Sequence, residues 1–147
     1  MIVVAIIVEG ALTPESQARA LAASGLDPRS TRSDGAVGAT LRFEGIVRRD
    51  EPHPEQRGEP RALLGLEYQT YDPMAQRGLE SLARAVAERH GLASIVVWHS
   101  RGRVGVGEVS FVLEISAAHR AETLAATASF IDAMKRDVPI WKSPVWA

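Results

Sequence analysis

The order in which strand-forming and helix-forming segments alternate is the feature of this sequence that most restricts its fold. Five segments are rich in β-branched or alternating apolar residues, and three others carry apolar residues at helical spacing between helix start and stop signals. The order β-α-β-β-α-β-β-α predicts an α+β fold in which helices pack on one face of a mixed sheet. The expected strands are 2–8, 36–49, 62–71, 93–100 and 108–116, and the expected helices are 12–24, 72–91 and 118–136.

No repeat or linker divides the chain, so we expect residues 1–147 to form a single domain. Segment 62–71 is expected to pair with segment 36–49 as a hairpin with a long connection. That connection, residues 50–61, is rich in proline and charge, which is typical of a mobile loop. The last helix is expected to align Leu124, Ala128, Ile131 and Met134 along one stripe.

Composition excludes several kinds of site. The formal net charge is −1, so no overall basic field attracts nucleic acid or an anionic membrane, and any anion site must be local. The absence of cysteine excludes a disulfide framework, a thiolate metal site and a cysteine nucleophile. No His/Asp/Glu spacing resembles a metal site. The apolar stretch 1–8 has no basic leader and is too short to span a bilayer, so we expect a buried strand and a cytoplasmic protein.

Two lysines near the end of the chain are the first candidates for chemistry. Lys135 lies near the end of the last expected helix, and Pro139 prevents that helix from continuing. The extended stretch that follows could fold Lys142 back towards Lys135. Two amines that converge in a partly apolar pocket favour a neutral amine, which can act as a nucleophile or a base. In the alternative, the neighbouring tryptophans anchor the chain and Lys142 reaches out to water.

Basic residues at two strand ends are further candidates. Arg48 and Arg49 are adjacent, and because strand side chains alternate, at most one of them can serve a given pocket. His119 and Arg120 stand at the expected start of the last helix, where unpaired N–H groups already favour an anion. A solvated strand end and an ordinary surface pair are the alternatives.

The glycine-rich stretch 102–108 resembles a phosphate loop only superficially. A strand follows it instead of a helix, and no Lys-Ser/Thr pair comes after its last glycine. It is therefore interpreted as a hairpin turn, which leaves a generic nucleotide-binding protein with little support.

Four stretches together resemble the MoaE family, the large catalytic subunits of molybdopterin synthase. They occur in the family's order and at its spacing, and the likeness runs from about Gly35 to Lys142. The histidine-arginine pair at a helix start, followed by a K-x-x-x-P-x-W-K pattern, is the most specific part. The stretches are DGAVGATLRFEGIVR (34–48), LEYQTYDPMAQ (66–76), SAAHRAE (116–122) and FIDAMKRDVPIWKS (130–143).

The resemblance implies an α/β hammerhead fold and a sulfurtransferase. Such enzymes convert cyclic pyranopterin monophosphate into molybdopterin by installing a dithiolene, in the biosynthesis of the molybdenum cofactor. The sulfur arrives on the C-terminal Gly-Gly thiocarboxylate of a small ubiquitin-like carrier (MoaD-like), and a homodimer with two carriers forms a heterotetramer. No cofactor or metal is implied.

The resemblance also assigns roles to the candidate residues. Lys135 and Lys142 would be catalytic, Lys135 as acid or base and able to form an isopeptide with the carrier, and Lys142 orienting or protonating the substrate. Arg48, His119 and Arg120 would hold the phosphate and the pterin, partly across the dimer interface.

The sequence departs from the family just after the second lysine. Ser143 and Pro144 stand where relatives commonly have an acidic residue, and the chain stops at Ala147 where relatives carry a longer charged tail. This difference keeps an alternative open, in which a degenerate module binds the pterin phosphate or the carrier without turnover.

Overall fold

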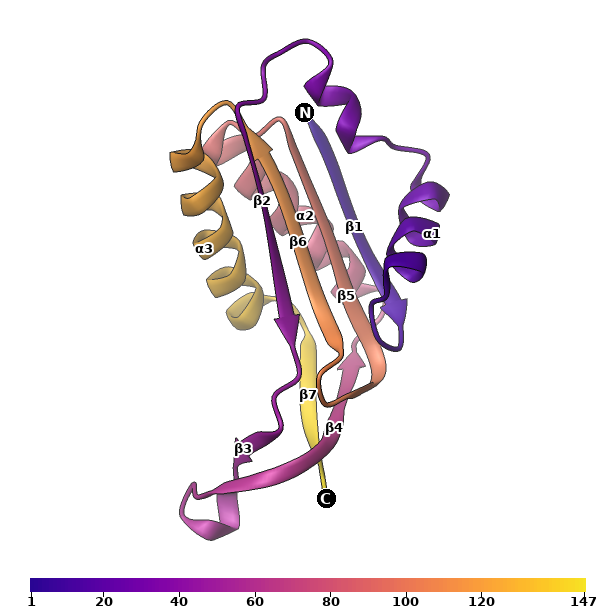
Figure 1. Ribbon diagram of the computed structural model, residues 1–147, viewed down its shortest axis with the longest axis vertical. Helices are drawn as coiled ribbons and strands as arrows, with labels where there is room; N and C mark the ends of the chain where they lie inside the picture. The colour runs from indigo at the N-terminus through magenta and orange to yellow at the C-terminus, as the bar shows by residue number, and fades with distance from the viewer.

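Seven strands form one mixed sheet in the computed structural model, which describes residues 1–147 (Figure 1). The first pairs only with the fifth, and that pairing is the parallel one. The other pairings are antiparallel. The strands are β1 (Ile2–Glu9), β2 (Ala39–Ile46), β3 (Asp50–Pro52), β4 (Pro60–Thr70), β5 (Ser94–Gly105), β6 (Val109–Ala117) and β7 (Ile140–Trp146).

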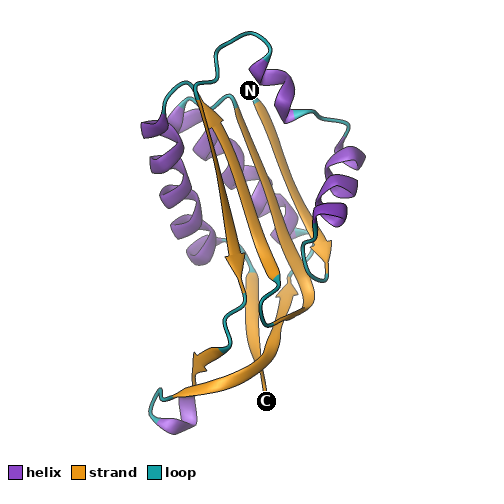
Figure 2. Cartoon of the chain, in the orientation of Figure 1, coloured by secondary structure: helices purple, strands orange, loops and turns teal.

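Helices lie on both faces of this sheet, whereas the sequence pattern predicted one face only (Figure 2). The helices are α1 (Pro14–Ser24), α2 (Met74–His90) and α3 (Arg120–Asp137), with 3-10 turns η1 (Pro28–Arg32) and η2 (Pro54–Gln56). One face packs Leu79 of α2 and Phe130 of α3 against Ile95. On the other face, Val4 and Trp98 form a cluster beside α1. The central strands are apolar on both sides, so both sides need cover. None of the helices is long and apolar enough to cross a membrane.

The long strand β5 joins two parts of the sheet. Its Ser94–Arg101 portion pairs with β1, and its Gly102–Gly105 portion pairs with β4. Strands β3, β4 and β7 therefore extend the sheet beyond the helices (Figure 1). The glycine-rich stretch 102–108 is the end of β5 and the turn into β6, as expected of a hairpin.

The expected pairing of segment 62–71 with segment 36–49 is wrong. Strand β2 pairs with β6, and β4 pairs with β3, β5 and β7. Gly65 explains part of this choice, because a Cβ at this position would lie 2.4 Å from the carbonyl oxygen of Val104. Only a glycine lets the β4 backbone approach β5 so closely.

The connection 50–61 is a short hairpin instead of an unstructured loop. Glu51 in β3 pairs with Arg61 in β4, and the His53 N–H donates to the Glu59 carbonyl at 3.0 Å. The His53 ring packs on Trp146 of β7, with ring centroids 4.6 Å apart. Composition alone suggested mobility because the partner that orders this hairpin lies more than 80 residues away.

Helix α3 confirms the expected stripe only in its last turns, where Met134 is buried and Ile131 packs against the core, whereas Ala128 is exposed. Leu124 is 55% exposed, while Thr123, Thr127 and Phe130 are buried. The Thr123 hydroxyl donates to the Arg120 carbonyl and the Thr127 hydroxyl to the Thr123 carbonyl, at 2.8 and 2.7 Å. These bonds satisfy the buried hydroxyls, so the helix can turn its threonines inward.

Strand β1 has a strand neighbour on one side only. On its free side, the Gln76 side chain of α2 donates from Nε2 to the Ala5 carbonyl at 2.7 Å. A side-chain amide therefore occupies one hydrogen-bonding position of the open edge.

Candidate functional site

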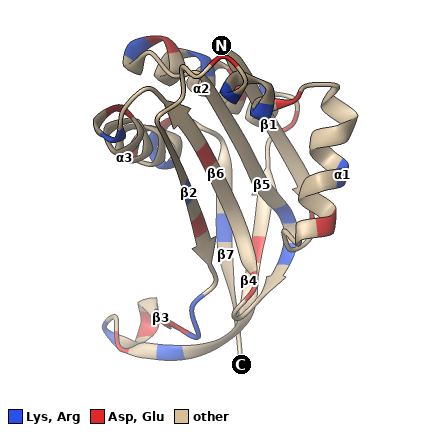
Figure 3. Cartoon of the chain, turned by 45° about the horizontal axis from the view of Figure 1, so that its top comes forward, with Lys and Arg blue, Asp and Glu red and all other residues tan.

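A cavity of about 600 Å³ opens where the last turns of α3 and strand β7 meet residues of β2, β3, β4, β5 and β6. Ten of its 17 lining residues are hydrophobic, among them Phe43, Phe111 and Trp141. Its charged lining residues are three cations and one carboxylate: Arg48, Lys135, Lys142 and Glu51. Basic and acidic residues are otherwise interspersed over the molecule in the view of Figure 3. The cavity is thus a local excess of positive charge on a nearly neutral protein.

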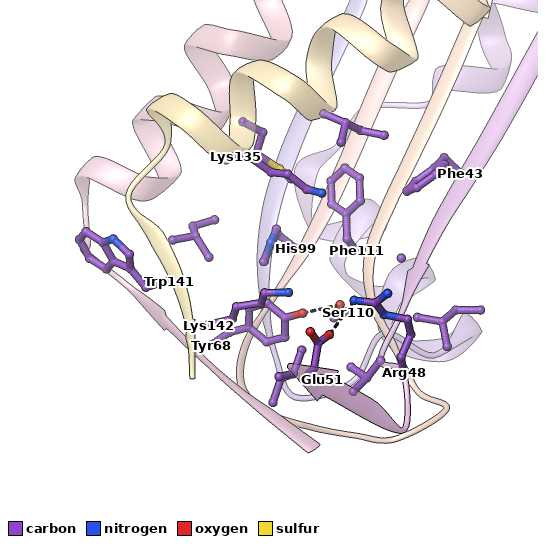
Figure 4. Close-up of a pocket in the computed structure, with 17 residues that line it drawn as sticks. Phe43, Arg48, Glu51, Tyr68, His99, Ser110, Phe111, Lys135, Trp141 and Lys142 are labelled. Atoms are coloured by element: carbon purple, nitrogen blue, oxygen red, sulfur yellow. Dashed lines mark hydrogen bonds and ion pairs between the residues drawn. The ribbon is translucent and has the colours of Figure 1, made fainter. Parts of the chain in front are cut away.

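The two lysines reach this cavity from consecutive elements, as the sequence predicted (Figure 4). Helix α3 ends at Asp137, and Val138 is already extended with φ −91° and ψ 129°. The chain then returns as β7 along β4, where Lys142 lies opposite Tyr68. Lys135 in the last turn of α3 and Lys142 in β7 therefore line the same space.

Of the two adjacent arginines, Arg48 lines the cavity and Arg49 does not. The Arg49 side chain is 80% exposed and pairs with Asp50 at 3.5 Å. The expectation that at most one of the pair serves a pocket is confirmed.

His119 and Arg120 do not reach this cavity within one chain. Both are exposed at the start of α3, with His119 as the N-cap residue. Fifteen residues separate Arg120 from Lys135, which is roughly 22 Å along a helix. The structure thus brings together three of the five predicted site residues and leaves two at the opposite end of α3.

Glu51 is a cavity residue that the sequence did not identify. Its Oε1 accepts from Nη2 of Arg48 at 2.9 Å, and its side chain is only 17% exposed. In the sequence it is one of several charges in a proline-rich stretch, and only its spacing of three residues from Arg48 hints at a pair.

Tyr68 and Ser110 add a hydroxyl pair to the cavity wall. The Tyr68 hydroxyl donates to Ser110 Oγ at 2.9 Å. Burial raises the pKa of Tyr68, the bond to Ser110 opposes this, and the charge of Glu51 raises it further. Tyr68 therefore keeps its proton at neutral pH. Because Ser110 Oγ accepts this bond, its own hydrogen is free for a ligand.

His99 forms a neutral part of the same wall. It is 5% exposed, its ring meets Tyr68 edge-on at 5.3 Å, and its Nδ1 lies 2.8 Å from the Ser100 carbonyl oxygen. A carbonyl only accepts, so Nδ1 carries the hydrogen and Nε2 is left as an acceptor. Burial lowers the pKa of His99, and the hydrogen bond to Ser100 opposes this only in part.

This burial predicts that acid destabilises the protein through His99. Its folded pKa lies below the unfolded value of about 6.5, so the unfolded chain binds more protons as the pH falls through that range. The free energy of unfolding should therefore be highest above about pH 6.5 and decline below it. In His99→Asn the new amide can still donate to the Ser100 carbonyl. The free energy of unfolding of this variant, measured by urea titration, should decline less between pH 7 and pH 5.5 than that of the unmodified protein.

The exposed His119→Asn is the matched control for that measurement and should keep the pH dependence of the unmodified protein. An equal decline in His99→Asn and in the unmodified protein would show that His99 is not the group responsible.

Comparison with known proteins shows which sequences and folds this chain resembles. A family model described as "MoaE protein" matches residues 16–137. A protein of Oryza sativa subsp. indica named "Molybdopterin synthase catalytic subunit" is 37% identical over 113 residues, covering 77% of this chain and 55% of that protein. A Nostoc sp. protein of the same name is 37% identical over 114 residues, covering 77% and 65%. The matches thus span about half to two thirds of these relatives' length.

Solved structures share the fold at lower sequence identity. Molybdopterin synthase from Staphylococcus aureus aligns with a TM-score of 0.70 and 24% identity, covering 96% of this chain and 90% of that one. A complex of subunits 1 and 2 of molybdopterin-converting factor from Helicobacter pylori aligns with a TM-score of 0.67 and 23% identity, covering 97% and 89%. The predicted class, α+β of the hammerhead type with helices on a mixed sheet, is confirmed.

Proposed function

This chain belongs to the MoaE family, and from that membership we propose that it is the catalytic subunit of a molybdopterin synthase. In this proposal it transfers sulfur from the thiocarboxylated terminus of a small ubiquitin-like carrier to cyclic pyranopterin monophosphate. The product is the dithiolene of molybdopterin, so the reaction belongs to the biosynthesis of the molybdenum cofactor. The 147 residues contain no cysteine, which agrees with a sulfur that arrives on a partner.

The observation that carries the proposal is the convergence of Lys135, Lys142 and Arg48 on one cavity. Its volume of about 600 Å³ falls in the range of sites that bury a small molecule. The apolar wall suits a flat pterin ring, and the cations suit a cyclic phosphate. Each charge-assisted hydrogen bond to the phosphate contributes roughly 1.5–3 kcal/mol.

We assign the roles by position in the cavity and by family membership. Lys135 acts as acid or base in the sulfur transfer, and Lys142 orients or protonates the substrate. Arg48 binds the phosphate. His119 and Arg120 bind substrate in the cavity of a second copy, because they stand at the far end of α3 in their own chain.

The proposed assembly is a homodimer with one carrier on each protomer. The carrier's Gly-Gly terminus enters the cavity between Lys135 and Lys142. Support for such a partner comes from the Helicobacter pylori relative, whose structure is a complex of two subunits.

Mixing the purified protein with thiocarboxylated carrier and cyclic pyranopterin monophosphate, followed by mass spectrometry, tests the proposal. We expect molybdopterin to form in proportion to carrier consumed. Carrier or substrate binding by calorimetry without product would favour the degenerate module instead. If neither binding nor product is detected, both functions are overturned, and the likeness to the family is then one of fold alone.

A further inference from the structure

Glu51 belongs to the hairpin 50–61 and lines the cavity, so this hairpin contributes to the candidate site. We propose that Glu51 is a positioning residue, which holds the Arg48 guanidinium at the cavity so that it is oriented to bind the anionic group of the substrate. The inference rests on the proposed function, in which Arg48 binds a phosphate.

Arg48 has a fixed backbone but a side chain that needs an anchor. On one side of it, the Val47 N–H donates to the Glu108 carbonyl at 3.0 Å. On the other side, the Arg49 carbonyl accepts from the Leu63 N–H at 2.7 Å. The Arg48 side chain is nevertheless 73% exposed, and an arginine free in solvent samples many rotamers. Glu51 is the group with which Arg48 makes an ion pair.

The backbone that carries Glu51 is held in place by contacts with β4 and β7. Glu51 lies in β3 opposite Arg61 of β4. The hairpin is pinned to β7 by His53, which is buried against Trp146, and by the Arg61 guanidinium, 5.7 Å from the Trp146 ring centroid. Lys142 also lies in β7, so the same strand fixes one cavity lysine and the hairpin that orients Arg48.

The geometry of the pair leaves room for a ligand. One contact joins the two side chains, from Nη2 of Arg48 to Oε1 of Glu51. A guanidinium has five N–H donors, so the remaining donors are free for an anion. Glu51 is the one carboxylate among the lining residues against three cations, so the cavity keeps an excess of positive charge. Glu51 therefore orients Arg48 without neutralising the cavity.

Glu51→Gln tests this inference, with Glu59→Gln as the matched control. Both residues lie in the hairpin, but Glu59 is exposed and does not line the cavity. For Glu51→Gln we expect KM for cyclic pyranopterin monophosphate to rise about 3- to 10-fold with kcat within about twofold, the pattern of lost uniform binding. Glu59→Gln should match the unmodified protein. In an Arg48→Gln background, Glu51→Gln should add no further effect, since it acts through Arg48.

A second readout does not depend on turnover. In NMR spectra, the Arg48 Nε–Hε signal should be distinct in the unmodified protein and move towards the position of exposed arginines in Glu51→Gln. Titration with inorganic phosphate should shift this signal, with about 3- to 10-fold weaker binding in Glu51→Gln. Unchanged Arg48 signals and phosphate binding, or tighter binding in the variant, would overturn the inference. If phosphate binding depends on Glu51 but the protein shows no synthase activity, the inference about Glu51 stands and only the proposed function is rejected.

Discussion

Lys135→Ala should lower the conversion of cyclic pyranopterin monophosphate to molybdopterin by on the order of 10²–10⁴-fold, the range for loss of a general acid or base. The fold should persist, because Lys135 is exposed and forms no ion pair whose partner would be left unpaired. Its contribution to the charge at the end of α3 is worth only about 0.3–1 kcal/mol. Single-turnover assays with thiocarboxylated carrier, together with thermal unfolding, measure both effects.

Arg136→Ala is the control, because it removes a positive charge from the same helix end. Arg136 is exposed and pairs with its neighbour Asp137 at 3.0 Å, outside the cavity lining, so this variant should stay active. Lys135→Arg separates charge from proton transfer, since a guanidinium keeps its proton. Activity in Lys135→Arg would reduce Lys135 to an electrostatic role, and normal turnover by Lys135→Ala would reject its assignment.

Mixing Lys135→Ala chains with Arg120→Ala chains should restore activity that neither variant has alone. In one chain these residues lie roughly 22 Å apart along α3, so Arg120 can serve only a second copy's cavity. A mixed dimer then has one cavity with both residues intact and one cavity that lacks both. With random exchange, half of the dimers are mixed, and activity should reach about a quarter of that of the unmodified protein.

A mixture of Lys135→Ala and Lys142→Ala chains is the matched control for complementation. Both lysines line the cavity of their own chain, so every cavity in this mixture lacks one of them. No activity should return. Full activity of Arg120→Ala alone, or equal recovery in both mixtures, would show that the start of α3 does not contribute across a dimer.

The residues that the sequence located are those whose placement depends on local chain geometry. Pro139 ends a helix and the next residues extend, which turns Lys142 back towards Lys135. Strand alternation separates Arg48 from Arg49. These relations span fewer than ten residues, so the sequence pattern contains them.

The residues that the sequence missed depend on pairing between distant segments. Tyr68 in β4 meets Ser110 in β6 across 42 positions, and neither residue type signals the other. Glu51 lies at the cavity in a hairpin whose His53 packs on the distant Trp146. The first half of the α3 stripe was predicted wrongly for a local reason, because Thr123 and Thr127 bury hydroxyls that bond to their own helix backbone.

The Gln76 amide on the free side of β1 bears on how the protein behaves at high concentration. An open edge strand with apolar residues on both faces is a template on which another molecule's strand can pair, and such pairing begins aggregation. Here the Ala5 carbonyl, midway along the eight-residue strand, already accepts from Gln76 Nε2. An incoming strand would have to displace an amide that is also tied to Glu80 at 2.7 Å. The Gln76 side chain of α2 thus blocks part of the free edge of β1 and opposes self-association through strand pairing.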